Sequence, residues 1–362
     1  MNTNDNHVVI MAGGIGSRFW PMSTTDRPKQ FIDVLGCGRT LIQLTADRFA
    51  GMCPPENLWV VTSAKYADLV REQLPEVPEA NILKEPCRRN TAPCIAYVSW
   101  KIKVRNPHAN VIVTPSDHVI MNVREFQRVA AAALEFTAGN DAILTLGMKP
   151  TRPETGYGYI QADLSHGALS NREIYRVDSF REKPDIETAQ LYIRKTNYLW
   201  NAGIFVWNVN TIVNSFRLLQ PDIADRFEAL LPVYDTPAEQ ARIDAMFPTC
   251  PNISVDYAIL EKADEIFTFP ADFGWSDLGT WGSLHTQLDK DLSGNVAIGP
   301  DITLYQSRNC VVHATGERKV VIIGLDGYIV AEDDDQLLVC KLTDEQRIKE
   351  FSDRPGGNPS NK

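Results

Sequence analysis

The sequence lacks the cysteine patterns that mark metal-binding or disulfide-stabilised domains. Its seven cysteines are an odd number, widely scattered, without a Cys-x-x-Cys pair and without a nearby histidine at zinc-binding spacing. We therefore expect reduced thiols, most of them in the core. This argues against a disulfide framework and against a structural zinc site.

Long hydrophobic runs are also missing. No apolar run approaches the length needed to span a bilayer. Residues 1–6 are polar and do not form the cationic start and apolar stretch of a secretory leader. The sequence therefore predicts a cytoplasmic protein with no membrane partner.

Positive charge is in short supply. The chain has 36 lysine and arginine residues against 46 aspartate and glutamate residues, a formal net charge of -10, and no long basic run. A nucleic acid would be repelled by such a surface, so we expect no nucleic-acid partner. Any anionic ligand must then meet a local positive pocket.

A glycine-rich segment follows the first apolar run, but it lacks the marks of two common phosphate-binding motifs. After Gly14-x-Gly16 the third glycine of the dinucleotide fingerprint is replaced by Phe19. Lys29 precedes Gln30, whereas a Walker loop places Ser or Thr after its lysine. Both of these motifs are excluded.

What this segment does contain is typical of a different anion cradle. Glycines allow the backbone N–H groups to approach a phosphate chain closely, and Arg18 and Lys29 supply positive charge. A tight turn with two surface cations would explain the same residues. The choice depends on the rest of the chain.

Composition and periodicity indicate an α/β fold with more than one structural unit. With 362 residues and 44% hydrophobic content the chain can bury a large core. Continuous rather than alternating apolarity predicts strands covered on both faces, separated by helices. The strands are expected at residues 8–11, 58–61, 111–113 and 142–146, and the helices at 40–50, 91–104 and 123–137.

This alternation predicts a doubly wound, mostly parallel sheet. Such sheets bind ligands outside the carboxyl ends of their strands, so the glycine loop, residues 85–91 and residues 114–118 are expected to line one rim. From 157 to 207 the pattern is less regular, with strands at 175–180 and 203–207 and helices at 186–195 and beyond 209, which indicates an inserted or mixed sheet region.

The pattern changes again near residue 292. Short apolar doublets separated by turn residues predict a small all-β domain at 292–351, after an α/β domain at 1–291. Periodicity alone leaves sandwich, barrel and β-helix open. The polar residues 352–362 are expected to form a disordered tail.

Several motifs, in one order along the chain, resemble those of sugar-phosphate nucleotidyltransferases and most closely those of the mannose-1-phosphate guanylyltransferases. The resemblance covers most of the chain through Trp281, and it implies a nucleotide-sugar transferase fold with a left-handed β-helix at the carboxyl end and a homodimer. The matching segments are 13–18, 27–31, 85–93, 115–118, 156–160, 180–184, 200–205, 254–258 and 274–279.

The resemblance implies an enzyme that transfers GMP from GTP to mannose 1-phosphate, releasing pyrophosphate and GDP-mannose. The attacking phosphate oxygen is already an anion, so no general base is required, and no Ser/His/Asp or Cys/His arrangement is recognisable. Catalysis then consists of in-line positioning and charge neutralisation, with Mg²⁺ as cofactor.

Residue roles follow from the same resemblance. Arg18 and Lys29 are the expected catalytic cations, and Asp117 and Asp277 the expected Mg²⁺ ligands. The expected nucleotide-binding residues are Ala12, Gly13, Gly14, Gly16, Ser17, Glu85, Arg89, Asn90, Thr91 and Ser116. The expected sugar-phosphate-binding residues are Gly156, Glu182, Lys183 and Asn201.

Several of these residues also have a purely structural alternative. Asp277 could cap a helix beginning at Leu278, and Asp117 could accept hydrogen bonds in a turn. Glu182 and Lys183 could be a solvated charged pair before a helix. The neighbouring aromatics at 200, 205 and 207 are expected in the core, and His118 is expected to position its loop.

Two functional alternatives remain open. One is a nucleotidyltransferase for another sugar 1-phosphate, such as glucose or heptose, because the same cations would serve it. The other is a non-catalytic GDP-sugar-binding regulatory subunit. Longer relatives carry an added isomerase domain, which is not expected in this chain.

Overall fold

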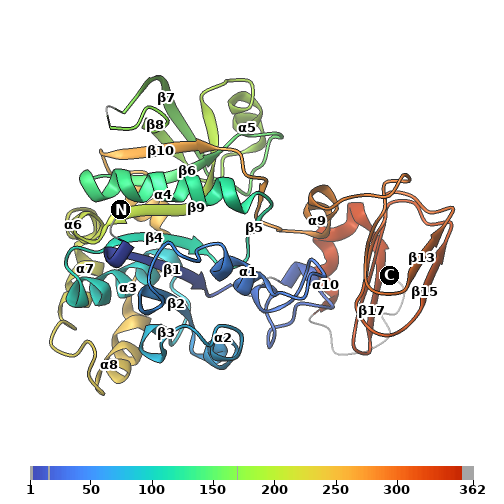
Figure 1. Cartoon of the computed structure of the whole chain (residues 1–362), viewed down its shortest axis with the longest axis horizontal. Helices are drawn as coiled ribbons and strands as arrows, with labels where there is room; N and C mark the ends of the chain where they lie inside the picture. Colours follow the sequence, from blue (N-terminus) through green and yellow to red (C-terminus); the bar gives the residue numbers. More distant parts are fainter. Residues whose placement is uncertain (1–2, 15–16, 169, 353–362) are drawn as a thin grey trace. The chain divides into compact units, whose positions relative to one another are not determined.

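The computed structural model describes residues 3–14, 17–168 and 170–352, and the chain divides into two compact units (Figure 1). Unit 1 comprises Met1–Gly13, Ala46–Ser116 and Ile120–Trp275. Unit 2 comprises Gly14–Thr45, Asp117–Val119 and Ser276–Lys362. Each unit is therefore assembled from segments that are distant in the sequence.

Unit 1 is built on a nine-stranded sheet in the order β3-β2-β1-β4-β9-β6-β10-β8-β7. The pairings make β8 and β9 run opposite to the other strands, so the sheet is mostly parallel, as predicted, with β9 inserted antiparallel between β4 and β6. The strands are β1 (Asn6–Ala12), β2 (Leu58–Ser63), β3 (Ile82–Glu85), β4 (Asn110–Pro115), β6 (Ile143–Met148), β7 (Tyr159–Gly167), β8 (Tyr175–Arg181), β9 (Tyr198–Asn208) and β10 (Ile266–Ala271).

The continuous apolar runs form strands because helices cover both faces of this sheet. In β1, Val9 belongs to the hydrophobic cluster shared with one set of helices, while its neighbours Val8 and Ile10 are equally buried on the other side. The first set consists of α3 (Thr91–Arg105), α6 (Val209–Leu219), α7 (Pro221–Glu228) and α8 (Glu239–Met246). Helix α4 (Val123–Gly139) packs on β4, β6, β9 and β10.

The elements predicted for the α/β region are confirmed in kind, with small differences at their ends. Helix α1 (Leu41–Asp47) and helix α5 (Ile186–Tyr192) are both shorter than the ranges predicted from the sequence. Helix α2 (Ala67–Gln73) lies between β2 and β3 in the chain. The α/β architecture therefore follows from the apolar pattern.

Unit 2 contains the all-β region expected after residue 292. One sheet has the order β12-β14-β16-β17 and a second pairs β13 with β15, and every pairing except β16 with β17 is parallel. Because consecutive strands from β12 to β16 alternate between the two sheets, the chain coils there as in a parallel β-helix. Its left-handed sense stays a prediction. The strands are β12 (Val296–Ile298), β13 (Ile302–Tyr305), β14 (Val311–Ala314), β15 (Val320–Ile323), β16 (Tyr328–Asp333) and β17 (Gln336–Lys341).

The edge of unit 2 does not coincide with the predicted domain boundary at residue 292. The reason is a hydrophobic cluster in which the segment after the glycine loop packs with helix α9 (Trp281–Gln287), the β strands and helix α10 (Ile348–Ser352). Its members include Phe19, Ile32, Leu41, Trp281, Val296, Val311, Ile329 and Ile348. Ser352 ends α10, and the rest of the predicted tail lies outside the described residues.

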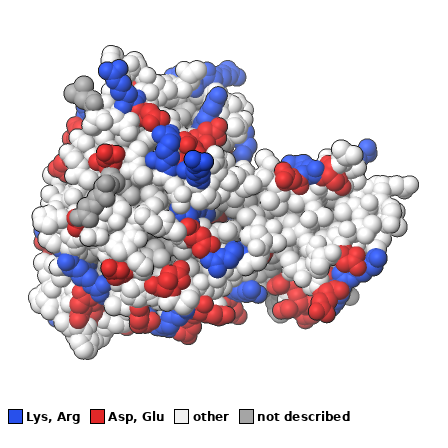
Figure 2. All heavy atoms as spheres, in the orientation of Figure 1, with Lys and Arg blue, Asp and Glu red and all other residues white. Residues whose placement is uncertain are grey.

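The surface agrees with a chain of net negative charge. Figure 2 shows acidic and basic side chains interspersed over the face that it draws. Within the described ranges, no helix combines the length and the apolar character that crossing a membrane requires.

A substitution at Gly36 tests how the segment after the glycine loop packs on β12. Gly36 has φ +67°, and an added Cβ would lie 2.4 Å from Ile298 Cγ2. We expect Gly36→Ala to lower the free energy of unfolding by about 2–3 kcal/mol, from backbone strain plus overpacking. Gly38→Ala is the control, because φ is +79° there and nothing lies within 4 Å of an added Cβ.

In the control, only the backbone strain of about 1 kcal/mol is expected. Urea unfolding measures both changes. Equal effects of the two substitutions would show that the contact between Gly36 and Ile298 is absent in solution.

Candidate active site

A cavity of about 230 Å³ in unit 2 brings together the four residues predicted to handle phosphate and metal. Arg18 comes from the short helix η2 (Ser17–Phe19), and Lys29 from η3 (Lys29–Phe31). The lining residues are Arg18, Phe19, Lys29, Asp117, His118, Asp277, Gly279 and Lys349. Residues far apart in the sequence therefore meet at one charged surface.

Lys29 is the buried centre of this arrangement. Its Nζ lies 2.9 Å from Asp117 Oδ2 and donates to the backbone carbonyl oxygens of Asp277 at 2.8 Å and Leu278 at 3.0 Å. The side chain is only 5% exposed. Because an ammonium group has three donors, these three oxygens satisfy it completely. Lys29 thus joins the loop of Asp117 to the turn of Asp277.

Asp117 is ionised at neutral pH. Burial by itself raises the pKa of its carboxyl, but the Lys29 ammonium and His118 outweigh that effect and hold the pKa below the ordinary 3.8. His118 Nε2 lies 3.9 Å from Asp117 Oδ1. The group is therefore in the charge state that a metal ligand requires.

Asp277 stands in a tight turn held from two directions. Its Oδ1 accepts a hydrogen bond from the backbone N–H of Gly279 at 3.1 Å, while its carbonyl accepts from Lys29. Leu278, the next residue, has φ +43°, which is strained for leucine. Helix α9 is capped by Thr280 in a capping box. The alternative in which Asp277 caps this helix is therefore wrong.

The donor chemistry of the cavity fits a divalent cation. Asp117 and Asp277 contribute hard carboxylate oxygens to the same cavity. Among residues 3–14, 17–168 and 170–352, no group of three or more His, Cys, Asp or Glu side chains is arranged to hold a metal. Two carboxylates match Mg²⁺ better than an ion that needs a full protein cage, because Mg²⁺ keeps waters and takes substrate oxygens.

Arg18 carries an unsatisfied donor beside this pair. Its side chain is half-buried, and its Nε is buried without a hydrogen-bond partner among the described residues. Buried donors of this kind are costly unless a ligand completes them. Of the glycine loop itself, Gly14 accepts from Gln30 Nε2 at 2.9 Å, Gly16 lies outside the described residues, and Ser17 begins η2.

In unit 1, Glu85 shows a comparable unsatisfied group. It ends β3, is 7% exposed, and its Oε1 has no hydrogen-bond partner in the described part of the chain. Its Oε2 lies 3.6 Å from where a Cβ on Gly13 would stand. Burial raises the pKa of Glu85 to about 8, despite the opposing effects of a hydrogen bond with Cys94 and the charge of Arg88.

The other predicted nucleotide-binding residues of unit 1 have structural contacts. Asn90, at φ +66°, caps α3 by accepting from the N–H of Thr91, and Thr91 Oγ1 accepts from Val255 N at 2.9 Å. Arg89 donates to the carbonyl of Pro248, while its Nε is buried without a partner among the described residues.

Two further predicted residues lie at carboxyl ends of strands. Ala12 ends β1, and its carbonyl accepts from Thr62 Oγ1 at 2.9 Å. Ser116 follows β4, and its N–H donates to the carbonyl of Met11 at 3.1 Å. The nucleotide-binding roles of all these residues stay predictions.

The predicted sugar-binding residues of unit 1 surround a carboxylate to which the sequence assigned no role. Asn201 Nδ2 donates to Asp256 Oδ1 at 2.9 Å, and Asn201 Oδ1 accepts from Thr145 at 2.9 Å. Asp256 lies in the segment 254–258, which belongs to the resemblance but carried no assigned chemistry. Asn201 therefore orients Asp256 through its side-chain amide.

Glu182 completes this carboxylate pair. It is 9% exposed, its Oε1 lies 3.1 Å from Lys183 Nζ, and a Cβ on Gly158 would come within 2.5 Å of its Oε2. Only glycine at 158 allows this approach. Burial and the negative charge of Glu182 raise the pKa of Asp256 to about 7.

Two further predictions near this site concern the backbone of Gly156 and a group of three aromatic side chains. Gly156 N donates to Glu154 Oε1 at 3.0 Å, so its backbone is held in a turn. Trp200, Phe205 and Trp207 are buried, which confirms that these aromatics belong to the core.

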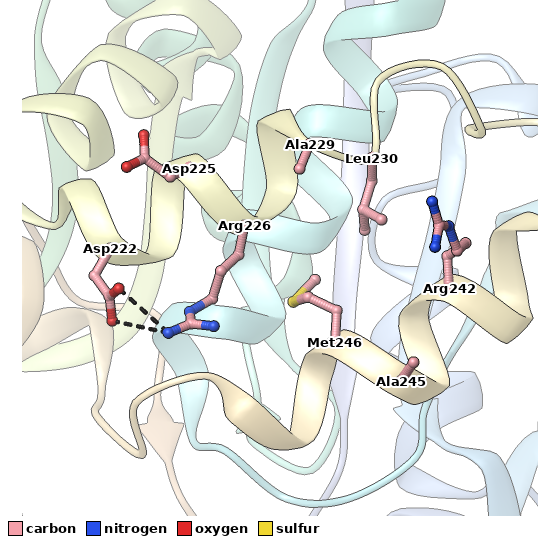
Figure 3. A pocket seen from close by; sticks show the side chains of 8 residues that line it. All are labelled: Asp222, Asp225, Arg226, Ala229, Leu230, Arg242, Ala245 and Met246. Atoms are coloured by element: carbon pink, nitrogen blue, oxygen red, sulfur yellow. Dashed lines mark hydrogen bonds and ion pairs between the residues drawn. The ribbon is translucent and has the colours of Figure 1, made fainter.

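A second cavity, of about 550 Å³, lies between α7 and α8 in unit 1 (Figure 3). Arg226 donates to Asp222 at 3.2 Å and to Thr249 Oγ1 at 2.7 Å. The cavity floor is apolar, with Leu230 and Met246, and none of the predicted site residues lines it. We assign no chemistry to it.

The contact between Lys29 and Asp117 can be measured by a double-mutant cycle with Lys29→Met and Asp117→Asn. Because the pKa of Asp117 is lowered in the folded state, the pair stabilises above pH 3.8 and loses its effect as the pH falls below that value. We expect a coupling of about 1–2 kcal/mol at pH 7, discounted for the partial exposure of Asp117. Urea unfolding at pH 7 gives the coupling, and strict additivity would contradict the contact.

Ionisation of Asp256 should make the free energy of unfolding depend on pH in the opposite direction. Its pKa is raised from 3.8 to about 7 on folding, so the protein loses stability as the pH rises through this window. Asp256→Asn removes that loss. Relative to the wild type, the variant should gain about 1–2 kcal/mol between pH 5 and pH 8. Thermal unfolding at both pH values measures it, with exposed Asp264→Asn as the control; an identical trend in both variants would contradict it.

Comparisons with known proteins identify the family of the chain. The family model described as nucleotidyl transferase matches residues 7–294. The alginate biosynthesis protein AlgA of Pseudomonas fluorescens is 36% identical over 348 residues, which are 95% of this chain and 70% of that protein. Mannose-1-phosphate guanylyltransferase 2 of Escherichia coli O157:H7 is 36% identical over 351 residues, covering 95% and 72%.

A solved structure is similar over nearly its whole length. The crystal structure titled mannose-1-phosphate geranyltransferase, from Thermus thermophilus, superimposes with a TM-score of 0.85 at 30% sequence identity, covering 96% of this chain and 98% of that one. Together with the family match, this shows that the chain is an enzyme of the nucleotidyl transferase family.

Proposed function

We propose that this enzyme transfers GMP from GTP to α-D-mannose 1-phosphate, producing GDP-mannose and pyrophosphate. The observation that supports this most strongly is the cavity that gathers Arg18, Lys29, Asp117 and Asp277. The guanylyl group and the sugar are supported by the relative named mannose-1-phosphate guanylyltransferase 2, which matches 95% of this chain. The predicted cytoplasmic location and homodimer stay predictions.

The charged cavity suits the phosphate chemistry of this reaction. A sugar-phosphate oxygen attacks the α-phosphorus of GTP, the bond to the bridging oxygen of the β-phosphate breaks, and pyrophosphate leaves with that electron pair. The attacking oxygen is already an anion, so the site needs no base. Arg18, with its unsatisfied Nε, would bind the departing pyrophosphate as a forked donor.

Asp117 and Asp277 would hold Mg²⁺. Bound there, the ion would neutralise part of the phosphate charge and align the reacting oxygens. Lys29 contributes by keeping the Asp117 carboxylate ionised and by fixing the turn of Asp277. The three donors of Lys29 face protein oxygens, so we propose that it acts through these contacts.

Glu85 would read the base. Guanine presents two adjacent donors, N1–H and the 2-amino group, which suit a carboxylate that accepts twice. Glu85 Oε1 lacks a partner among the described residues, so such a ligand would satisfy it. Because burial raises the pKa of Glu85 to about 8, its carboxyl would lose a proton on accepting these two hydrogen bonds from GTP near pH 7.

Sugar recognition would fall to Glu182 and Asp256. Carboxylate oxygens accept hydrogen bonds from sugar hydroxyls, and Asn201 fixes the direction of Asp256. Lys183, whose Nζ pairs with Glu182 and whose side chain is 58% exposed, would meet the sugar phosphate. The sugar pocket is thus proposed to be acidic, with one cation at its edge.

A matrix of nucleoside triphosphates against sugar 1-phosphates tests the proposal, with pyrophosphate release measured with and without Mg²⁺. We expect GTP with mannose 1-phosphate to be fastest, with no release in the absence of a divalent cation. Faster pyrophosphate release with glucose 1-phosphate or a heptose 1-phosphate would assign that sugar as the substrate in place of mannose. GDP-mannose binding without release in any pairing would indicate the regulatory-subunit alternative.

Glu85→Gln sharpens the test of base recognition. Loss of the double acceptor should reduce kcat/KM for GTP by about 5- to 150-fold, the range of a two-point base contact. ITP lacks the 2-amino group, so wild type should discriminate between GTP and ITP and the variant should not. Glu76→Gln, the same change at an exposed position of unit 1, serves as the control. Retained discrimination in Glu85→Gln would remove Glu85 from base reading.

A further inference from the structure

We propose that Lys349, near the carboxyl end of the chain, is a further phosphate-binding cation of the unit 2 cavity, beside Arg18, and contacts the triphosphate of the nucleotide. The inference rests on the proposed function for the identity of the ligand. Its basis is that Lys349 lines the same cavity as Arg18 and Lys29. No local motif marks this lysine in the sequence.

Helix α10 is anchored beside the predicted phosphate-binding loop. Ile348 is 2% exposed and belongs to the hydrophobic cluster that contains Phe19, and α10 packs against η2, the short helix that carries Arg18. Lys349 follows Ile348 directly. The buried Ile348 side chain therefore fixes the position of the backbone from which the Lys349 side chain extends.

A second anchor fixes the segment that leads into α10. Glu345, in the short helix η9 (Leu342–Arg347), accepts a hydrogen bond from the backbone N–H of Gly282 at 2.7 Å through its Oε2. Gly282 lies in the first turn of α9, directly after the turn of Asp277. The carboxyl-terminal segment is thus held by both the Arg18 side and the Asp277 side of unit 2.

The balance of charged side chains in the cavity supports this role for Lys349. Asp117 and Asp277 contribute two negative charges, and Lys29 is committed to Asp117. Without Lys349, Arg18 and Lys29 only balance the two carboxylates. With Lys349 the side chains of the lining are net positive before any divalent cation binds, which suits a site for a highly charged triphosphate in a chain of net charge -10.

The experiment compares Lys349→Ala, Lys349→Glu and Lys349→Arg with Lys341→Ala. Lys341 ends β17, is exposed and is absent from the cavity lining, so its substitution makes the same charge change elsewhere in unit 2. Initial rates give kcat and KM for GTP and for mannose 1-phosphate. Calorimetry gives the affinity for inorganic pyrophosphate, a readout that needs no turnover.

We expect Lys349→Ala to raise the KM for GTP and weaken pyrophosphate binding about tenfold, the effect of losing one charge-assisted contact. Lys349→Glu should weaken both further, and Lys349→Arg should keep most of the wild-type affinity. The KM for mannose 1-phosphate should change less than that for GTP. Thermal unfolding should change far less than pyrophosphate affinity, because Lys349 is exposed.

Equal behaviour of Lys349→Ala and Lys341→Ala in both assays would overturn the inference while leaving the proposed function intact. A wild type without guanylyltransferase activity would overturn the proposed function. In that case the pyrophosphate titration still decides the role of Lys349, because it measures phosphate binding alone.

Discussion

The ammonium group of Lys29 is the interaction on which the site of unit 2 depends. It is buried, yet three oxygens from two distant parts of the sequence surround it: the Asp117 carboxylate and the carbonyls of residues 277 and 278. A buried cation is stable only with such partners. Folding therefore brings the two predicted metal ligands to one cavity as a condition of satisfying this single charge. One of these carbonyls belongs to Leu278, whose φ of +43° is strained for leucine.

The two units contribute different chemistry. In unit 2 the polar groups are strongly charged and paired, as a phosphate site requires. In unit 1 the functional candidates Glu85 and Asp256 are buried carboxyls whose pKa values are raised to about 8 and about 7. Such groups are costly to ionise and gain from ligands that donate hydrogen bonds, which is the character of a purine edge and of sugar hydroxyls. The separation of charge handling from hydrogen-bond recognition fits a transfer between two phosphate esters.

Much of this could be predicted from the sequence, because it is local. Continuous apolar runs such as Val8–Ile10 predict doubly covered strands, and the motifs around residues 18, 29, 117 and 277 predict a phosphate and metal site. The antiparallel placement of β9 could not be predicted, because apolar periodicity does not encode strand direction. Nor could the packing of residues 14–45 on the β strands, which depends on long-range contacts such as that of Gly36 with Ile298.

The residues proposed to be functional that sequence reasoning missed were missed for the same reason. Lys349 is one lysine in a charged carboxyl-terminal segment, and only the burial of Ile348 against Phe19 places it at the cavity. Asp256 lies in a segment that matched the family, but its chemistry depends on contacts with Asn201 and Glu182 that are distant in sequence.

The most direct measurement is a crystal structure of the protein grown with Mn²⁺ and a non-hydrolysable GTP analogue, with the anomalous signal locating the ion. An ion coordinated by carboxylate oxygens of both Asp117 and Asp277, and by a phosphate oxygen of the analogue, is the predicted result. An ion bound to the phosphates but to neither aspartate, or two carboxylates too far apart to share it, would contradict the central claim.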